Sequence, residues 1–409
     1  KKILYYSDCF IFGGCEILLV NLINSLSSNS QFEIRFAYAY NELYQAGVEK
    51  YLKYCYSLDT LCVLGNDNLF YRLDSSGINK LVVFFCKLPF ILIRKTGIYS
   101  FYNFIRLWFY FRKINPDILH INNGGYPGAR SCLVAVFSAK MAGIRKIVFN
   151  VNNIAQNQKN VLERAVDKYI NNNVDYFVTA SALAQNKLVA CRRFCADKVL
   201  QIFNAAPQDK PTKVRSEMLD EFNITEEKFV IVTVALLTGR KGQLYLLQAI
   251  VGIREIAPAV FKNIVLILVG DGEDRVKLER YISDKNLSKQ ILITGYRNDY
   301  CNFISAADLF VLPSISNEDM PLVILTAMSL GKAIISTKVA GITEEIRDGV
   351  DGVLVEPKDV ALLASSIVNL YNSKELREQY GLSSRNRYLD LFSLDIIMSQ
   401  YCKLYMQLV

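Results

Sequence analysis

The sequence predicts an α/β protein with two domains, each built on a parallel sheet. Its 409 residues exceed one ordinary domain and suit two domains of about 200 residues each. Hydrophobic residues make up 52% of the chain, enough to form large buried cores, which excludes a disordered or fibrous protein. Short apolar segments alternate with helical patterns along the whole chain, as expected for parallel sheets covered on both faces.

The N-terminal half opens with a predicted strand at 1–6, a glycine-containing turn and a helix at 16–27. Apolar and β-branched runs predict further strands at 32–40, 117–121, 146–151, 176–181 and 198–203. Helical patterns lie around 128–142, 160–172 and 182–192. Residues 205–217 are polar and contain proline, which predicts a linker between the two halves.

The C-terminal half repeats the alternation, with strands predicted at 229–235, 263–270, 290–295, 308–313, 332–337 and 352–357. After the strand at 308–313 comes a short apolar helix, for which Pro321 suits the first helical position and Gly331 the stop. Glu318 and Asp319 therefore lie at the carboxyl end of a strand, where open α/β sheets bind ligands. The alternative is that both acids only favour the positive helix N-terminus.

Charge and cysteine usage narrow the class of protein. Residues 1–204 hold 24 Lys/Arg and 13 Asp/Glu, whereas the remainder holds 23 and 26, so the first half suits an anionic partner. Ten cysteines without CxxC spacing and a single histidine predict a reduced, cytosolic protein without a His/Cys metal cluster. The N-terminus reads as a buried strand and not as a signal peptide.

Three glycine-bearing loops follow predicted strands. In residues 12–16, Gly13 and Gly14 would let backbone N–H groups approach an anion. In residues 236–243, Lys241 offers a point charge for a diphosphate. The third loop, 269–274, is better explained as a plain turn. None of the three matches GxGxxG or the Walker pattern, so a dinucleotide fold or P-loop kinase is not supported.

Taken in order, these motifs resemble the retaining glycosyltransferases of family 4. The resemblance rests on GGxE (Gly13, Gly14, Glu16), Lys241-Gly242, and the segments at 270–273, 293–295, 306–314, 318–328, 339–346 and 348–359. It implies the GT-B fold, in which two Rossmann-like domains face each other across a cleft. Residues 1–204 would bind the acceptor, residues 205–394 the nucleotide-sugar donor, and a helix at 395–409 would cross back to the first domain.

The resemblance also implies roles for individual residues. Glu318 would lie by the donor sugar ring, Lys241 would neutralise the leaving diphosphate, and Asn122 would be the third catalytic residue. Donor binding would involve Gly13, Gly14, Arg240, Gly295, Tyr296, Arg297, Asp319, Met320, Pro321, Leu322 and Thr326. The N-domain cleft would include Glu16, Asn152 and Asn204. The family needs no metal for the leaving group, so no metal or other cofactor is expected.

The sequence departs from the family pattern at several site positions. Thr326 stands where the family has its second glutamate, and Leu236 stands where it has an arginine, with Arg240 as a possible substitute. Asn122 and Asn152 occupy positions at which family members often carry histidines. The one histidine, His120, lies within a predicted strand and is expected to be structural.

Residues 80–113 form a basic aromatic stretch with seven Lys/Arg, no acid and eleven aromatic residues. Its apolar run at 81–93 is too short to span a bilayer. The composition suits an interfacial segment on an anionic membrane, and the alternative is a pair of ordinary helices packed on the sheet. Nothing in the stretch resembles a recognition helix, so nucleic acid is not an expected partner.

Together, the family resemblance and the basic aromatic stretch imply a peripheral enzyme at the inner face of the cell membrane. It would transfer a sugar, with retention, from a nucleotide-sugar (a UDP-sugar by family frequency) to a lipid-linked saccharide in surface polysaccharide or glycan synthesis. Alternatives are a catalytically silent homologue acting as a partner subunit, a nucleotide-sugar 2-epimerase, and a membrane-binding protein without activity. A loop carboxylate contributes little to a core, so Glu318→Ala is expected to abolish transfer with folding nearly intact.

Overall fold

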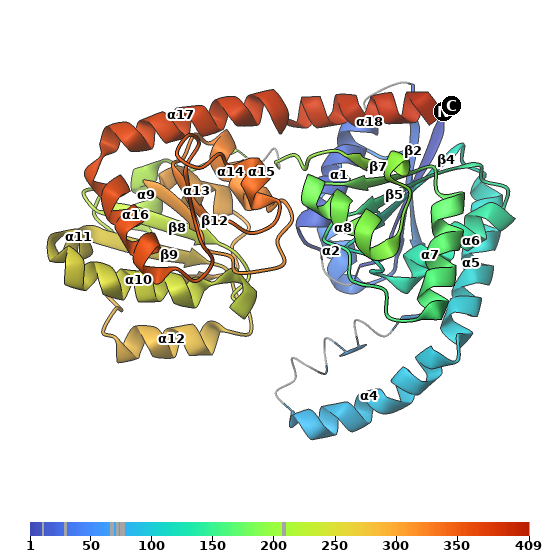
Figure 1. Cartoon of the computed structure of the whole chain (residues 1–409), viewed down its shortest axis with the longest axis horizontal. Helices are drawn as coiled ribbons and strands as arrows, with labels where there is room; N and C mark the ends of the chain where they lie inside the picture. Colours follow the sequence, from blue (N-terminus) through green and yellow to red (C-terminus); the bar gives the residue numbers. More distant parts are fainter. Residues whose placement is uncertain are drawn as a thin grey trace. The chain divides into compact units, whose positions relative to one another are not determined.

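The computed structural model describes residues 1–9, 12–27, 31–65, 69–70, 73, 78–206 and 210–408. The chain forms two compact units, shown in Figure 1. The first unit comprises Lys1–Ile202 and Met398–Val409, and the second comprises Phe203–Ile397. The sequence placed the corresponding boundaries at 204/205 and 394/395.

The first unit is built on a seven-stranded parallel sheet with strand order β3-β2-β1-β4-β5-β6-β7. Its strands are β1 (Lys2–Ser7), β2 (Glu33–Ala39), β3 (Ser57–Leu61), β4 (Ile118–Asn123), β5 (Lys146–Val151), β6 (Tyr176–Thr179) and β7 (Val199–Gln201). Its helices are α1 (Gly14–Ser27), α2 (Glu42–Tyr51), α4 (Lys80–Lys95), α5 (Ile98–Ile114), α6 (Arg130–Met141), α7 (Val161–Asn173), α8 (Ala182–Arg192) and the 3-10 turn η1 (Ala196–Lys198).

Successive side chains of the central strands point to opposite faces of this sheet. On one face, Leu4 and Tyr6 of β1 belong to a buried core together with residues of α5 to α8. On the other face, Tyr5 meets α18 (Leu394–Leu408), most of which belongs to the first unit. Tyr405 of α18 shares short hydrogen bonds with the Tyr5 hydroxyl (2.6 Å) and with His120 Nδ1 (2.6 Å). Complete burial lowers the pKa of His120 to about 3, so this histidine is a neutral structural residue, as predicted.

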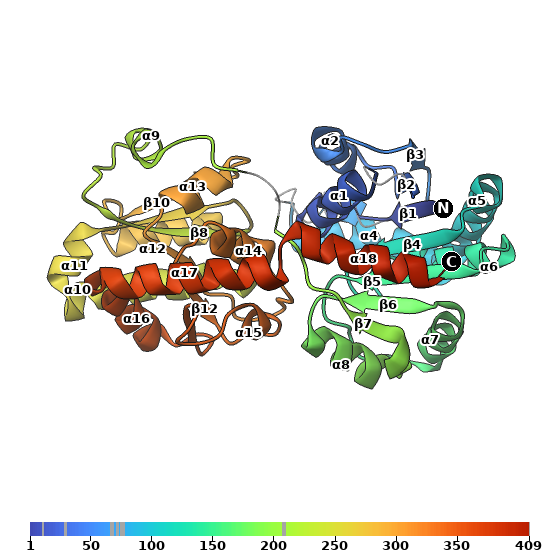
Figure 2. The ribbon, with the colours of Figure 1, turned by 90° about the horizontal axis from the view of Figure 1, so that it is seen from above.

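The second unit is built on a six-stranded parallel sheet with strand order β10-β9-β8-β11-β12-β13. Its strands are β8 (Phe229–Val234), β9 (Ile264–Val269), β10 (Ile291–Gly295), β11 (Leu309–Leu312), β12 (Ile334–Thr337) and β13 (Val353–Val355). Its helices are α9 (Arg215–Asp220), η2 (Gly239–Lys241), α10 (Gln243–Ile256), α11 (Pro258–Asn263), α12 (Arg275–Asp284), α13 (Tyr300–Ala306), α14 (Leu322–Ser329), α15 (Ile342–Glu345), α16 (Val360–Asn372) and α17 (Lys374–Leu391). Figure 2 shows helices on both sides of each sheet.

The two parallel sheets confirm the predicted GT-B architecture of paired Rossmann-like domains. The sequence missed β3, because this edge strand has only partly exposed and exposed residues and no continuous apolar run. The predicted linker at 205–217 ends within α9, and its residues 207–209 lie outside the described residues. The prediction for Pro321 was wrong by one position, since Pro321 is the N-cap and α14 begins at Leu322.

Candidate functional site

The sheet order of the second unit places two predicted site loops side by side. Strands β8 and β11 are neighbours, and the chain proceeds outward from them in opposite directions along the sheet. Such a switch in strand order leaves a crevice at the carboxyl ends of the two strands, where open α/β sheets bind ligands. The loop after β8 carries Lys241, and the loop after β11 carries Glu318. The topology therefore brings these two predicted residues together.

A glycine allows the two loops to touch. Gly242 has φ +73°, and a Cβ at this position would lie 2.0 Å from the Pro313 carbonyl oxygen. Only glycine fits this combination of left-handed backbone and close approach. The Ile315 N–H donates to the Arg240 carbonyl oxygen at 2.8 Å, which fixes the two loops to each other.

Glu318 is the centre of a buried ionic cluster. Its side chain is 6% exposed, and its Oε1 accepts from Arg240 Nη1 at 2.8 Å and from Ser314 Oγ at 3.1 Å. The Lys241 ammonium forms an ion pair with the same oxygen. Lys241 is 8% exposed, whereas the Arg240 side chain is 39% exposed. The cluster thus presents two cations at the switch point, one buried and one reaching solvent.

Burial sets the protonation behaviour of Lys241. Removal from water lowers the pKa of its ammonium, and attraction to Glu318 opposes this shift without cancelling it. A desolvated ammonium beside a carboxylate can stabilise an additional anion strongly, because little water screens the charge. The arrangement suits a ligand on which negative charge develops.

The segment between Glu318 and α14 is held rigidly. The Asn204 amide donates to the Met320 carbonyl oxygen at 2.9 Å, and Asp319 is 5% exposed. Asn204 belongs to the second unit, which begins at Phe203, whereas the sequence placed Asn204 at the end of the first domain. Pro321 caps α14, whose first N–H groups at Leu322 have no partner within the helix. Binding of the donor phosphate at this helix start stays a prediction.

Four other predicted donor residues do not join this cluster. Thr326 is 1% exposed and its hydroxyl donates to the Leu322 carbonyl oxygen at 3.0 Å, within its own helix. Arg297 pairs with Asp299 and with Glu221 Oε1 at 2.6 Å, and this pairing lowers the pKa of Asp299 to about 2. Tyr296 is 70% exposed, and Gly295 ends β10. Their contacts with a nucleotide remain predictions.

The first unit has its own switch point between β1 and β4. Here the Asn152 amide donates to Asn122 Oδ1 at 2.8 Å, and the Asn122 amide lies 3.5 Å from Ser7 Oγ. Nearby, the Gly13 N–H donates to Glu16 Oε2 at 3.0 Å. Gly14 begins α1. Glu16 is 4% exposed, burial raises its pKa, and its hydrogen bond with Gly13 ties it to the glycine turn.

Sequence reasoning missed two residues of the second-unit site. Ser314 follows β11 and contacts Glu318, a contact that a position directly after a strand could have suggested. Glu345 ends α15 and is fully buried. It lies within the segment 339–346 that carries the family resemblance, but periodicity gave no sign that its carboxyl points inward.

The described residues contain neither a cluster of metal-binding side chains nor a helix that could span a membrane. In the ranges that the structure describes, no group of three or more His, Cys, Asp or Glu side chains could hold a metal ion. Among the same residues, no helix has the length and apolar character needed to cross a bilayer.

Comparison with known proteins identifies the second unit. Residues 214–387 match the family model for glycosyl transferases group 1. The chain is similar to UDP-Gal:alpha-D-GlcNAc-diphosphoundecaprenol alpha-1,3-galactosyltransferase of Escherichia coli, with 27% identity over 75% of this chain and 79% of the relative. It is 29% identical to the lipopolysaccharide core biosynthesis glycosyltransferase LpsE of Rhizobium meliloti over 43% of this chain and 49% of that protein.

A solved structure extends the match to the fold of the whole chain. The structure of Anabaena Alr3699/HepE in complex with UDP superimposes with a TM-score of 0.76 and 17% identity, covering 100% of both chains. At this identity the likeness concerns the fold alone. The chain therefore has the GT-B fold, and its residues 214–387 match the family model for glycosyl transferases group 1.

Proposed function

We propose that this protein is a retaining glycosyltransferase that transfers a sugar from a UDP-sugar to a lipid-linked saccharide. The observation that carries the proposal is the buried cluster of Lys241, Arg240 and Glu318 at the switch point of a group 1 domain. The Escherichia coli relative, whose name specifies a UDP-sugar donor and a diphosphoundecaprenol-linked acceptor, supports both substrate classes.

In the proposed reaction, the acceptor hydroxyl oxygen forms a bond to the anomeric carbon while the bond from that carbon to the diphosphate breaks. The electron pair of the broken bond goes to the diphosphate oxygen, and the hydroxyl proton passes to a phosphate oxygen. Lys241 and Arg240 stabilise the charge that develops there, and the N–H groups at the start of α14 bind the phosphate. Attack on the face that the leaving group occupies gives retention of configuration.

The same cluster argues for an active enzyme over a silent homologue. Lys241 is held in a desolvated position, where its ammonium pairs with Glu318, and a buried ion pair seldom stabilises a fold more than well-packed apolar residues do. Lys241 and Arg240 also supply positive charge where the leaving diphosphate would develop its negative charge, without a metal ion. We therefore expect transfer to continue in the presence of EDTA.

A panel of donors tests the proposed function. Purified protein is incubated with UDP-, GDP- and ADP-sugars, with and without a bacterial lipid extract, and nucleotide release is measured. We expect release from a UDP-sugar, an increase with lipid, and a product whose anomeric coupling constant matches that of the donor. Absence of release and of any donor-induced thermal shift would favour the silent homologue.

We propose that the protein reaches its lipid-linked acceptor by binding a membrane. Helices α4 and α5 would rest on the anionic inner face of the cell membrane. Figure 1 shows α4 projecting from the first unit beyond the end of α5. Large apolar side chains on both helices are exposed, including Phe84, Phe85 and Phe101 at 52%, 61% and 66%. Basic residues without any acid accompany them in the stretch 80–113. Rings at headgroup depth with cations facing anionic lipid are the features of an interfacial segment.

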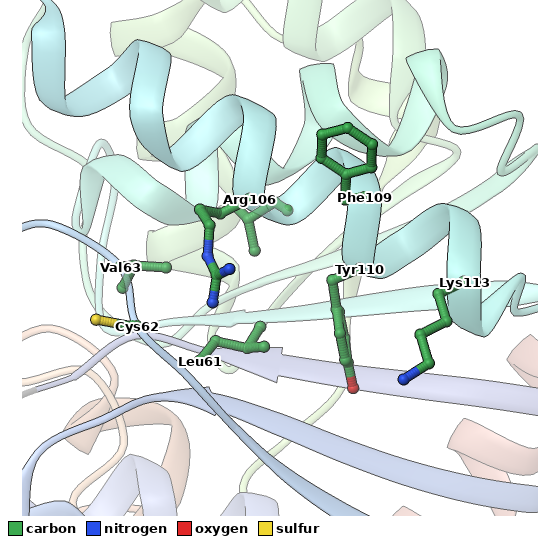
Figure 3. A pocket seen from close by; sticks show the side chains of 8 residues that line it. Leu61, Cys62, Val63, Arg106, Phe109, Tyr110 and Lys113 are labelled. Atoms are coloured by element: carbon green, nitrogen blue, oxygen red, sulfur yellow. The ribbon is translucent and has the colours of Figure 1, made fainter.

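A surface pocket beside α5 supports an amphiphilic ligand on this side. The pocket of about 200 Å³ in Figure 3 is lined by Leu61, Cys62, Val63, Arg106, Leu107, Phe109, Tyr110 and Lys113. It is smaller than the roughly 300–1,000 Å³ of sites that enclose a small molecule, so it does not suit a nucleotide-sugar. Apolar walls with two cationic side chains suit a phosphate group that carries an alkyl chain.

We expect the double variant Phe85→Ser/Phe101→Ser to weaken binding to vesicles of anionic phospholipid by on the order of tenfold. Each partly inserted ring contributes about 1 kcal/mol. Co-sedimentation with the vesicles measures the affinity. The matched control is Val161→Ser/Leu162→Ser on α7, which removes two side chains that are 77% and 74% exposed in the same unit. Equal binding by both double variants would contradict the assignment of α4 and α5.

A further inference from the structure

The structure contains one fully buried carboxyl group in the second-unit site that the proposed reaction does not use. Glu345, the last residue of α15, is 0% exposed. Neither of its carboxyl oxygens has a hydrogen-bond partner among the described residues. An ionised carboxylate in such a position would cost several kcal/mol, so the group is neutral in the resting protein.

Close packing brings Glu345 to the ionic cluster. A Cβ at Gly341, the residue before α15, would lie 2.1 Å from the Asp319 carbonyl oxygen, so α15 begins in contact with the Glu318–Asp319 loop. Burial is the largest cause of a raised pKa at Glu345. The nearby carboxylates of Glu318 and Asp319 raise this pKa further, and Lys241 opposes them.

The other charged groups around Glu345 belong to its own helix and to α17. Glu344 precedes it and also raises the pKa of Glu345. Arg387 of α17 donates Nε to the Glu345 carbonyl oxygen at 2.9 Å and Nη2 to the Glu344 carbonyl oxygen at 2.8 Å. It also pairs with Asp351 at 3.6 Å. The Arg387 guanidinium thus binds the backbone of α15. Lys241 is the cation that lowers the pKa of the Glu345 carboxyl.

The charge balance of the cluster depends on Glu345. With Glu345 neutral, the cations Lys241 and Arg240 face the carboxyl groups of Glu318 and Asp319. Ionised Glu345 would add a negative charge and attract Lys241 away from an anionic ligand. A donor diphosphate would then meet one more negative charge in a desolvated site, where such repulsion is strong.

We propose that Glu345 is a positioning residue of the donor site, whose neutral carboxyl leaves Lys241 available to the donor diphosphate and whose ionisation weakens donor binding. This inference rests on the proposed use of a nucleotide-sugar. Glu345 acts through Lys241 and does not touch the donor.

The test is the affinity for UDP, measured by calorimetry between pH 5.5 and pH 9.5 on the full chain. In the unsubstituted protein we expect the dissociation constant to rise on the order of tenfold as Glu345 ionises. Glu345→Gln keeps the shape without the titration, so it should bind UDP as tightly at low pH and lose most of this rise. Glu344→Gln, the matched control one residue away, should keep the rise.

Lys241 also has a lowered pKa and will weaken UDP binding at alkaline pH. A rise in the dissociation constant that is identical in Glu345→Gln and the unsubstituted protein therefore belongs to Lys241 and overturns the inference about Glu345. Absence of UDP binding by the unsubstituted protein at every pH contradicts the proposed donor instead, and the inference falls with it.

The stability of the fold as a function of pH tests the neutral state of Glu345 without any ligand. A carboxyl whose pKa is raised in the folded state destabilises the fold once the unfolded chain ionises, so stability falls as pH rises from about 4.5 to the folded pKa. We expect this fall to be smaller in Glu345→Gln than in Glu344→Gln, as measured by urea unfolding. Identical slopes would show that Glu345 is not held neutral.

Discussion

Replacing Glu318 by glutamine is expected to reduce sugar transfer at least about 100-fold, with the loss in kcat. Glutamine keeps the volume and an oxygen for Ser314, but it removes the negative charge that orients Arg240 and Lys241. Loss of one preorganised electrostatic group at a reacting centre typically costs about 100- to 1,000-fold. Steady-state nucleotide release at saturating donor measures the effect.

The structure changes the expected effect of Glu318 on folding. From the sequence, Glu318 was expected to be a loop carboxylate that contributes little to stability. In the structure it is 6% exposed and pairs with Lys241, which is 8% exposed. Removing one partner of a buried pair leaves an uncompensated charge and costs about 3 kcal/mol, at the lower end of the usual range because Arg240 is partly solvated. Glu318→Ala is therefore expected to be destabilised, because the burial of Glu318 contradicts the premise from which nearly intact folding was predicted.

Two controls separate chemistry from stability in the Glu318 experiment. Kinetics are measured at a temperature where circular dichroism shows each variant to be folded. Glu378→Gln on α17 removes a carboxylate that is 68% exposed in the same unit and should leave both rate and stability unchanged. Full transfer activity in folded Glu318→Gln would mean that the catalytic site lies elsewhere.

The sequence predicted the strand content well, because the buried strands are short runs of β-branched and aromatic residues. Strand β9, for example, is IVLILV, and every one of its residues is buried. Parallel strands buried on both faces leave a strong local signal of this kind. The edge strand β3 lacks such a run, and only its pairing with β2 shows it to be a strand.

The candidate site was predicted in part, because position after a strand can be read from the sequence but the direction of a side chain cannot. Lys241 and Glu318 lie at adjacent strand ends, and the structure joins them as expected. The family resemblance assigned Arg297 to the nucleotide, and nothing in the sequence indicated that Asp299 and Glu221 pair with its guanidinium. Glu345 is buried by the packing of α15 on a loop more than twenty residues away, and no local pattern encodes that contact.

Replacing Lys241 by methionine is expected to weaken UDP binding and to reduce transfer at least about 100-fold. Methionine fills the space of the lysine stem but supplies no charge for the diphosphate. The variant also leaves Glu318 with Arg240 as its cationic partner, so stability should change less than in Glu318→Gln. Calorimetry with UDP and nucleotide release measure the two effects.

Lys241→Met should also change how the stability of the fold depends on pH. Burial lowers the pKa of Lys241 in the folded state below its ordinary value of about 10.5. Between the lowered pKa and 10.5 the unfolded chain binds more protons than the folded protein, so stability contributed by this group rises with pH. That rise should be absent from Lys241→Met when urea unfolding is followed from pH 7 to pH 10.

Lys332 provides the matched control, because burial lowers its pKa as well. Its ammonium donates to the Ala307 carbonyl oxygen at 2.9 Å and has no contact with the Glu318 cluster in the described residues. Lys332→Met should therefore lose a similar rise of stability with pH while binding UDP normally. If both variants lost UDP binding equally, the effect would come from a weakened domain, and Lys241 would have no special role toward the diphosphate. If only Lys241→Met loses UDP binding, the result supports direct stabilisation of the donor diphosphate by the Lys241 ammonium.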